Sequence, residues 1–173
     1  MKPKTQRATL LAATMAAVLT MGAWHGMQPE PPVLRVGRAV SCADGTVTVP
    51  IRFHPGPDVD VVGLSGDVAF DTSALANPRC DVSGILERGK HEGSGTMKTI
   101  VCSEPRPGLV RLGIFGLDME RIPRGKLATL TFDVVAGADP GFYPLTITAD
   151  SSNAAGEDMD VTGRDGRVRV GQR

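Results

Sequence analysis

The chain has 173 residues, 41% of them hydrophobic, and its 19 Lys and Arg residues balance its 19 Asp and Glu residues to a net charge of +0. A chain of this length buries a hydrophobic core of its own, and the balanced charge gives no electrostatic footprint for nucleic acid. We therefore expect a globular domain without a nucleic-acid partner. The 21 glycines and 13 prolines are spread between short apolar runs, which is typical of an all-β sandwich or barrel.

Residues 1–26 have the pattern of a secretory signal peptide. Three basic residues and no acid precede an uncharged apolar run, Ala8–Ala23, which is shorter than the roughly 20 residues of a membrane-spanning helix. Cleavage after this segment leaves 16 basic and 19 acidic residues, a net charge of −3. We predict a protein that is secreted, periplasmic or in the cell envelope. The alternative is an uncleaved segment that anchors the protein to a membrane.

A proline-rich linker at 27–32 precedes a single domain at 33–171. The first predicted strand is Val33–Val36, which we place at a sheet edge. The next strand covers 46–53, where every second residue is apolar. Because Pro50 has no backbone N–H, we expect this second strand to lie at an edge or to bend there.

Three more strands are predicted at 61–70, 97–102 and 109–115, because apolar and polar residues alternate in them. A glycine-rich loop at 84–96 precedes the second of the three. The alternation directs four side chains away from the core. These are Ser65, Asp67, Arg111 and Phe115.

The clearest strand of the chain is 125–134. Its apolar residues alternate with polar ones, so one face is expected in the core. The inward residues are Ala128, Leu130, Phe132 and Val134. Leu127 is out of phase with them, which predicts either a β-bulge near Lys126 or an apolar residue on the outer rim.

Two further strands, 142–149 and 167–170, enclose an acidic loop at 150–160. They bring the count to about nine strands with no amphipathic helix, and the predicted fold class is a nine-stranded antiparallel β-sandwich. The acidic loop lacks the regularly alternating oxygen ligands of an EF-hand. We interpret it as a solvated loop, with a calcium site as the alternative, and we predict no cofactor.

Three cysteines in an exported chain suggest one disulfide and one thiol. We predict the pair Cys80 and Cys102, because each lies in a candidate strand and the glycine-rich loop separates them. Cys42, in a predicted turn, would then be free. Pairing of Cys42 with either of the other two remains open.

The sequence contains no recognisable active site. The three histidines, His25, His54 and His91, form no pair with zinc-ligand spacing, and no nucleophile elbow is present. We therefore predict a protein that is not an enzyme and holds no metal. Aromatic residues make up 4% of the chain, which also argues against a flat stacking platform for sugars.

Four segments, taken in order, resemble the cohesin family, the receptor half of the cohesin–dockerin pair of polysaccharide-degrading complexes. They are Thr46-Val-Thr-Val-Pro-Ile51, Val68-Ala-Phe-Asp-Thr-Ser-Ala-Leu75, Arg124-Gly-Lys-Leu-Ala-Thr-Leu-Thr-Phe132 and Asp165-Gly-Arg-Val-Arg-Val170. The resemblance implies a jelly-roll sandwich whose two ends lie side by side, and a protein partner of the dockerin type. Phe70 departs from the family, which often has tyrosine there, and the predicted disulfide is not a general family feature.

The resemblance also implies that the partner binds one sheet face, carried by strands 61–70, 97–102 and 109–115. We therefore predict the four outward residues of this face as the contact site, with Phe115 as the apolar anchor and Asp67 and Arg111 as polar contacts. Two alternatives belong to other classes. One is a carbohydrate-binding module, and the other is a structural envelope protein that contacts the membrane through an uncleaved N-terminal segment.

Overall fold

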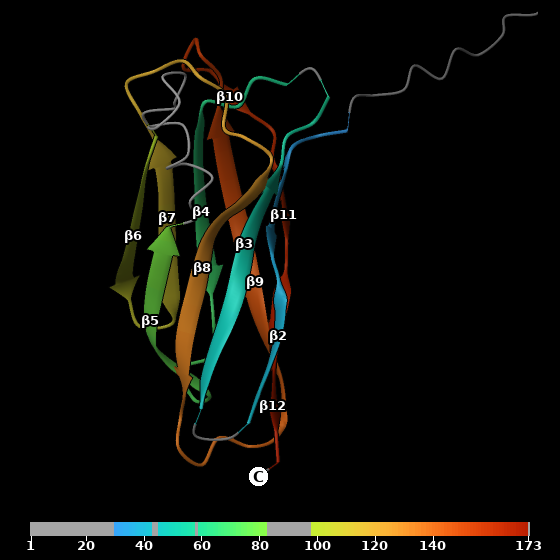
Figure 1. Cartoon of the computed structure of the whole chain (residues 1–173), viewed down its shortest axis with the longest axis vertical. Helices are drawn as coiled ribbons and strands as arrows, with labels where there is room; N and C mark the ends of the chain where they lie inside the picture. Colours follow the sequence, from blue (N-terminus) through green and yellow to red (C-terminus); the bar gives the residue numbers. More distant parts are fainter. Residues whose placement is uncertain (1–29, 43–44, 58, 83–97, 173) are drawn as a thin grey trace, which may run out of the picture.

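The computed structural model describes residues 30–42, 45–57, 59–82 and 98–172. The predicted signal segment, the first part of the linker and the glycine-rich loop lie outside this part of the chain. Throughout the described residues the regular structure is β, in twelve strands that form two sheets, which confirms the predicted β-sandwich (Figure 1). No helix in this part of the chain is long and apolar enough to cross a membrane.

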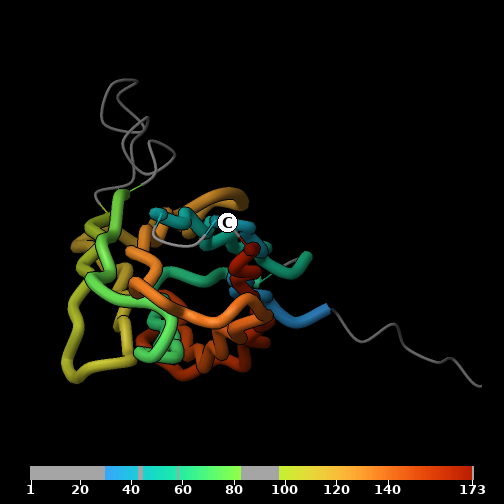
Figure 2. The backbone as a smooth tube through the Cα atoms, turned by 90° about the horizontal axis from the view of Figure 1, so that it is seen from below, coloured from blue at the N-terminus to red at the C-terminus, as the bar shows by residue number. Residues whose placement is uncertain are grey.

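The two sheets form two layers, which Figure 2 shows from below. The first sheet contains, in spatial order, β11 (Thr162–Arg164), β1 (Val33–Val36), β3 (Thr46–His54), β8 (Gly125–Val134) and β5 (Leu75–Val82). The second contains β2 (Arg38–Cys42), β12 (Gly166–Gly171), β9 (Gly141–Ser152), β4 (Gly63–Ala69), β7 (Leu109–Phe115) and β6 (Thr99–Arg106), with β10 (Asp158–Met159) paired to β9.

The strand count and directions differ from the prediction in three places. The chain passes from β1 in one sheet to β2 in the other at Gly37, so the first segment contributes two strands. The predicted acidic loop at 150–160 is shortened to a turn between two strands, because β9 continues to Ser152 and β10 covers Asp158–Met159. The pairs β1–β11 and β2–β12 are parallel. Strand β1 lies between β11 and β3 and is therefore not at an edge.

The core lies between the layers and is built by the predicted alternation. Phe132 of β8 in the first sheet packs against Phe70, which follows β4 of the second, with ring centroids 5.0 Å apart. The other inward residues of β8 are buried as predicted. This tilted ring contact between the two sheets stabilises their packing, in addition to the stabilisation from the apolar area that the rings bury.

The predicted bulge is present in β8. Ile51 of β3 pairs with Ala128, and the next residue, Arg52, pairs with Lys126, so Leu127 is an extra residue in its strand. Leu127 and Ala128 are both fully buried. The bulge therefore turns two consecutive apolar side chains into the core, and the alternative of an apolar residue on the rim is wrong.

Pro50 lies inside the first sheet, next to this bulge, and not at an edge. Its carbonyl accepts a hydrogen bond from the Gly37 N–H at 2.8 Å, and the Gly37 carbonyl accepts one from the Arg167 N–H of the other sheet at 3.3 Å. Because proline offers no N–H to Gly37 in return, the Gly37 carbonyl is left to bind across to the second sheet. The crossing thereby fastens the two sheets together.

The disulfide forms between Cys80 and Cys102, as predicted, with the Cα atoms 6.2 Å apart. These residues lie in β5 and β6, the edge strands on the same side of the two sheets, whose backbones lie together in Figure 2. The bond therefore closes one open side of the sandwich. Cys42 is the free, exposed cysteine, and it ends β2 instead of lying in the predicted turn.

The point where the chain passes from β1 to β2, at Gly37, leaves no room for a side chain at Gly166. A Cβ there would lie 2.1 Å from the Gly37 carbonyl oxygen and 2.6 Å from a methyl group of Val36. We expect Gly166→Ala to lower the free energy of unfolding by about 1–3 kcal/mol, because backbone must move to admit the methyl group. Urea unfolding measures this. The control Gly141→Ala, where a Cβ has no neighbour closer than 4.0 Å, should change it little, and equal effects would contradict the analysis.

Removing the disulfide should destabilise the domain. The bond spans 22 residues, and on the chain-entropy model the Cys80→Ser, Cys102→Ser variant loses about 3 kcal/mol of unfolding free energy. Urea denaturation with and without reductant is the measurement. Reductant should destabilise the wild type and leave the variant unchanged. A variant as stable as the oxidised wild type would show that the bond does not hold the edges together.

Candidate functional site

The candidate site is the outer face of β9, β4, β7 and β6, which are consecutive strands of the second sheet. In the β4–β7 ladder Asp67 lies opposite Arg111, and Ser65 lies opposite Gly113. Leu64 and Val68, the neighbours of these residues along β4, are buried. The structure thus brings Ser65, Asp67 and Arg111 together on one outer face, with Phe115 at the end of β7 on the same face.

Asp67 and Arg111 form a two-pronged ion pair across the strands. The Arg111 Nε donates to Asp67 Oδ1 at 2.8 Å, and Nη2 donates to Oδ2 at 2.7 Å. Hydrogen bonding from Arg111 lowers the pKa of Asp67 below 3.8, and burial opposes this shift. A guanidinium has five N–H donors, so three remain for another molecule while the carboxylate fixes the plane of the group.

Phe115 is 56% exposed, and its ring leans over Gly113, where a Cβ would lie 3.7 Å from the ring. Val101 of β6, opposite Gly113, is 47% exposed, and the chain continues from Phe115 to Leu117 and Met119, which are 95% and 69% exposed. We call these four residues, Val101, Phe115, Leu117 and Met119, the apolar rim. Most large exposed hydrophobic side chains of the described residues belong to it.

The segment after β7 that carries Leu117 and Met119 is held by buried contacts. The Lys98 side chain is fully buried, and its Nζ lies 2.6 Å from Asp118 Oδ1 and donates to the Asp118 carbonyl at 2.9 Å. Ile122 is buried and donates its N–H to the Val61 carbonyl at 2.8 Å. Leu117 and Met119 are therefore presented to solvent by an anchored segment.

A shallow hollow of about 310 Å³ lies at the apolar rim. Residues of β4, β7 and β9 line it, among them Gly63, Gly113, Ser65, Phe115 and Asp150. The predicted contact residues Ser65 and Phe115 therefore border the same depression. The face as a whole offers an apolar end, a depression and an oriented guanidinium, which are the elements of surface recognition.

Sequence reasoning missed Val101, Leu117 and Met119. The alternation of apolar residues does continue past Phe115 to Leu117 and Met119, but the prediction ended the strand at Phe115. Val101 was in a predicted strand, and its outward direction follows from its position opposite Gly113. The period-two pattern therefore carried a signal for Leu117 and Met119, whereas the direction of Val101 is known only from strand pairing, and the exposure of all three depended on packing.

The acidic segment is organised by its own turn. The side-chain oxygen of Asn153 accepts the N–H groups of Ala155 and Glu157 at 2.9 and 3.0 Å, and its Nδ2 donates to the Glu157 carboxylate at 2.8 Å. Within the described residues, no group of three or more His, Cys, Asp or Glu side chains is placed to hold a metal ion.

Comparison with known proteins gives a match in structure but not in sequence. No family model matches the chain, and no curated protein matches it. The cohesin CaCohA2 of Clostridium acetobutylicum is 20% identical, with a TM-score of 0.65 over 83% of this chain and 93% of that one. A non-cellulosomal cohesin from Archaeoglobus fulgidus is 14% identical, with a TM-score of 0.60 over 82% and 91%.

A third similar structure is the cohesin of a type I cohesin–dockerin complex from Clostridium thermocellum. It is 14% identical, with a TM-score of 0.65 over 82% of this chain and 99% of that one. The protein has the cohesin fold. The ordered segments that resemble cohesins in the sequence therefore correspond to a cohesin-fold sandwich in three dimensions.

The Asp67–Arg111 pair can be tested by titration. In Arg111→Ala the pKa of Asp67 should rise towards 3.8, because the hydrogen bonds that favour its charged form are lost. Carboxyl NMR measures it. Asp71, whose pKa is lowered by hydrogen bonds from Ser73, is the control and should not move. An unchanged Asp67 would show that the pair does not form in solution.

The Asp67–Arg111 ion pair makes the stability of the protein depend on pH in a predictable direction. Because the pKa of Asp67 is lower folded than unfolded, the pair stabilises the protein above about pH 4 and loses this contribution as pH falls through the folded pKa. Solvent screening limits the contribution to about 1 kcal/mol or less.

Proposed function

We propose that this protein is a non-catalytic binding module, and that the outer face of β9, β4, β7 and β6 binds a protein partner of the dockerin type. The cohesin fold supports a binding module, and a similar cohesin structure is that of a cohesin–dockerin complex. The observation that carries the proposal is the position of an oriented arginine beside an exposed aromatic ring on one face.

Arginine and aromatic residues are the side chains that most often dominate binding energy at protein interfaces. Arg111 is held by Asp67, so less side-chain entropy is lost when it meets a partner. Its side chain is 57% exposed, whereas that of Asp67 is 27% exposed, so the guanidinium is the more accessible half of the pair. The apolar rim supplies area for the hydrophobic centre of an interface, with Phe115 as its anchor.

We further propose that the protein acts outside the cytoplasm, and that its partner belongs to a polysaccharide-degrading system. The disulfide between β5 and β6 supports an oxidising compartment, and residues 1–26 have the composition of an export signal. The association with polysaccharide degradation rests on the family resemblance of the sequence.

The proposal predicts that the Arg111→Ala, Phe115→Ala variant binds a dockerin partner at least about tenfold more weakly than the wild type, since both anchors are lost. The measurement is calorimetry against purified dockerin domains, with the domain that best binds the wild type carried forward. Thermal unfolding verifies that the variant is folded.

The matched control is Arg79→Ala, Val82→Ala, which removes an ion-paired arginine and an exposed apolar residue from the other sheet. It should bind as the wild type does. Equal weakening by both variants, or equal affinity of the first variant and the wild type, would contradict the assignment of the face.

A further inference from the structure

A row of positive charges crosses the outer face of the first sheet, on the side of the sandwich opposite the candidate site. Arg35 of β1 lies opposite Arg164 of β11 on one side and opposite Arg52 of β3 on the other, and Arg52 lies opposite Lys126 of β8. All four side chains are exposed. We call these four residues the cationic row. Because neighbouring strands are about 4.8 Å apart, the row is a line of charges perpendicular to the strands.

Folding does not account for this arrangement. Like charges directly opposite each other destabilise a sheet, and the row contains three such pairs in succession. None of its members forms an ion pair with a described residue.

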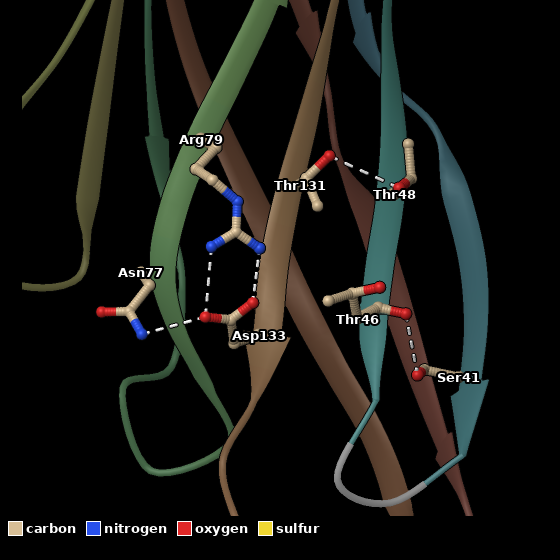
Figure 3. A network of polar contacts seen from close by, with 7 residues as sticks. All are labelled: Ser41, Thr46, Thr48, Asn77, Arg79, Thr131 and Asp133. Carbon is tan, nitrogen blue, oxygen red and sulfur yellow. Dashed lines mark hydrogen bonds and ion pairs between the residues drawn. The ribbon is translucent and has the colours of Figure 1, made fainter.

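Arg79, on the same face, has a structural role because it is paired with an acid. Figure 3 shows Asn77 and Arg79 of β5 converging on Asp133 of β8, with the Asn77 amide at 2.9 Å and Arg79 Nη1 at 3.2 Å from the carboxylate. At this end of the sheet an acid faces the arginine, whereas across the cationic row each charge faces another cation. Among the described residues, therefore, no acid is paired with the cationic row, and an anionic ligand would supply the missing partners.

A hollow of about 600 Å³ opens beside the cationic row. Arg35, Arg124 and Arg164 line it, together with His54 and the loop 55–57. Among the residues that are described in its wall, Glu30 is the one acid against three arginines. The volume is within the range of sites that bind small ligands or a few units of a polymer.

The pKa of His54 is affected by the positive charges around the hollow. It accepts a hydrogen bond at Nδ1 from Arg124 Nε at 3.1 Å. Its pKa is lowered from 6.5, first by burial and then by the charges of Arg124, Arg35, Arg52 and Arg164. Arginines from three strands and a loop therefore act on one point at the edge of the hollow.

We propose that the cationic row and the adjoining hollow bind an anionic polysaccharide whose charged groups are carboxylates or sulfates. Planar guanidinium groups bind such oxyanions with two parallel hydrogen bonds. The line of charges suits an extended chain with a repeating charge, which would also relieve the repulsion within the row.

Hydroxyl groups on this face distinguish a glycan from an acidic peptide. Thr48 and Thr131 lie opposite each other on β3 and β8, with their hydroxyl oxygens 3.4 Å apart (Figure 3). Thr129 lies opposite Pro50, nearer the row. A polysaccharide presents anions and hydroxyls along one chain, and this face presents partners for both. The large exposed hydrophobic side chains of the described residues on this sheet include no aromatic ring, so recognition here is by charge and hydrogen bonds rather than stacking.

The test compares the full chain with an Arg35→Gln, Arg52→Gln, Arg164→Gln variant on immobilised polygalacturonate and dextran sulfate, with neutral dextran as the blank. The wild type should bind one of the two anionic polymers and release with rising salt, and the variant should bind at least about tenfold more weakly. The thermal midpoint of the variant should equal or exceed that of the wild type, because repulsion in the row is relieved.

The matched control is Arg38→Gln, Arg167→Gln, Arg169→Gln, which removes three exposed arginines from β2 and β12 of the other sheet. Arg38 and Arg167 also lie opposite each other, but the guanidinium carbons of Arg167 and Arg169 lie over the Phe142 ring, 4.9 and 5.7 Å from its centroid, so these two arginines already have a contact within the protein. It should retain wild-type binding to the polymers. The proposal is overturned if the wild type binds neither polymer, or if both triple variants lose binding equally. It is also overturned if polyglutamate, an oligonucleotide or phosphatidylglycerol vesicles bind the row more tightly than either glycan.

This inference does not depend on the proposed function. The arginine substitutions in the first sheet should leave binding of a dockerin partner unchanged, and Arg111→Ala, Phe115→Ala should leave polysaccharide binding unchanged. Failure of one assignment is therefore distinguishable from failure of the other.

Discussion

The fold depends on the crossing of the chain between its two sheets at Gly37. At this point one residue completes a ladder with Pro50 in the first sheet and accepts a hydrogen bond from Arg167 in the second. Glycine is needed because a Cβ at Gly37 would lie 2.7 Å from the Pro50 ring, and proline is tolerated inside a sheet because its partner carbonyl binds elsewhere. The crossing, the core between the layers and the disulfide on the opposite side keep the two layers in a fixed relation.

A sandwich fixed in this way presents two outer faces that point in opposite directions. The face of β9, β4, β7 and β6 combines an ion-paired arginine with an apolar rim, which suits a protein surface. The opposite face combines hydroxyls with cations that form no ion pair with any described residue, which suits a hydrophilic polyanion. Because the core separates the faces, a partner on one does not obstruct a ligand on the other. If both proposals hold, the module would hold a protein against an acidic glycan.

Period-two alternation was sufficient to predict which residues of β4, β7 and β8 point inward, because one buried face determines the direction of every side chain in a strand. The break at Leu127 left two alternatives, a bulge or an apolar residue on the rim, and the pairing of β3 with β8 shows the bulge. The division at Gly37 was not predictable, since β1 and β2 read as one segment until their partners are known. The contact residues Ser65, Asp67, Arg111 and Phe115 share a face as predicted, and their role in binding stays a prediction.

The cationic row was missed because it depends on register and not on local sequence. Arg35, Arg52, Lys126 and Arg164 come from four separate strands, and each has an ordinary neighbourhood along the chain. The balanced net charge conceals them, since acids elsewhere compensate for them in number. An acid lies close to each of two other exposed arginines, Asp133 near Arg79 and Asp67 opposite Arg111, whereas another arginine lies opposite Arg35. A single pair of opposed cations is not enough to indicate a site, since Arg38 and Arg167 of the second sheet also form one. The inference depends on the unbroken row of four cations together with the hollow that Arg35, Arg124 and Arg164 line.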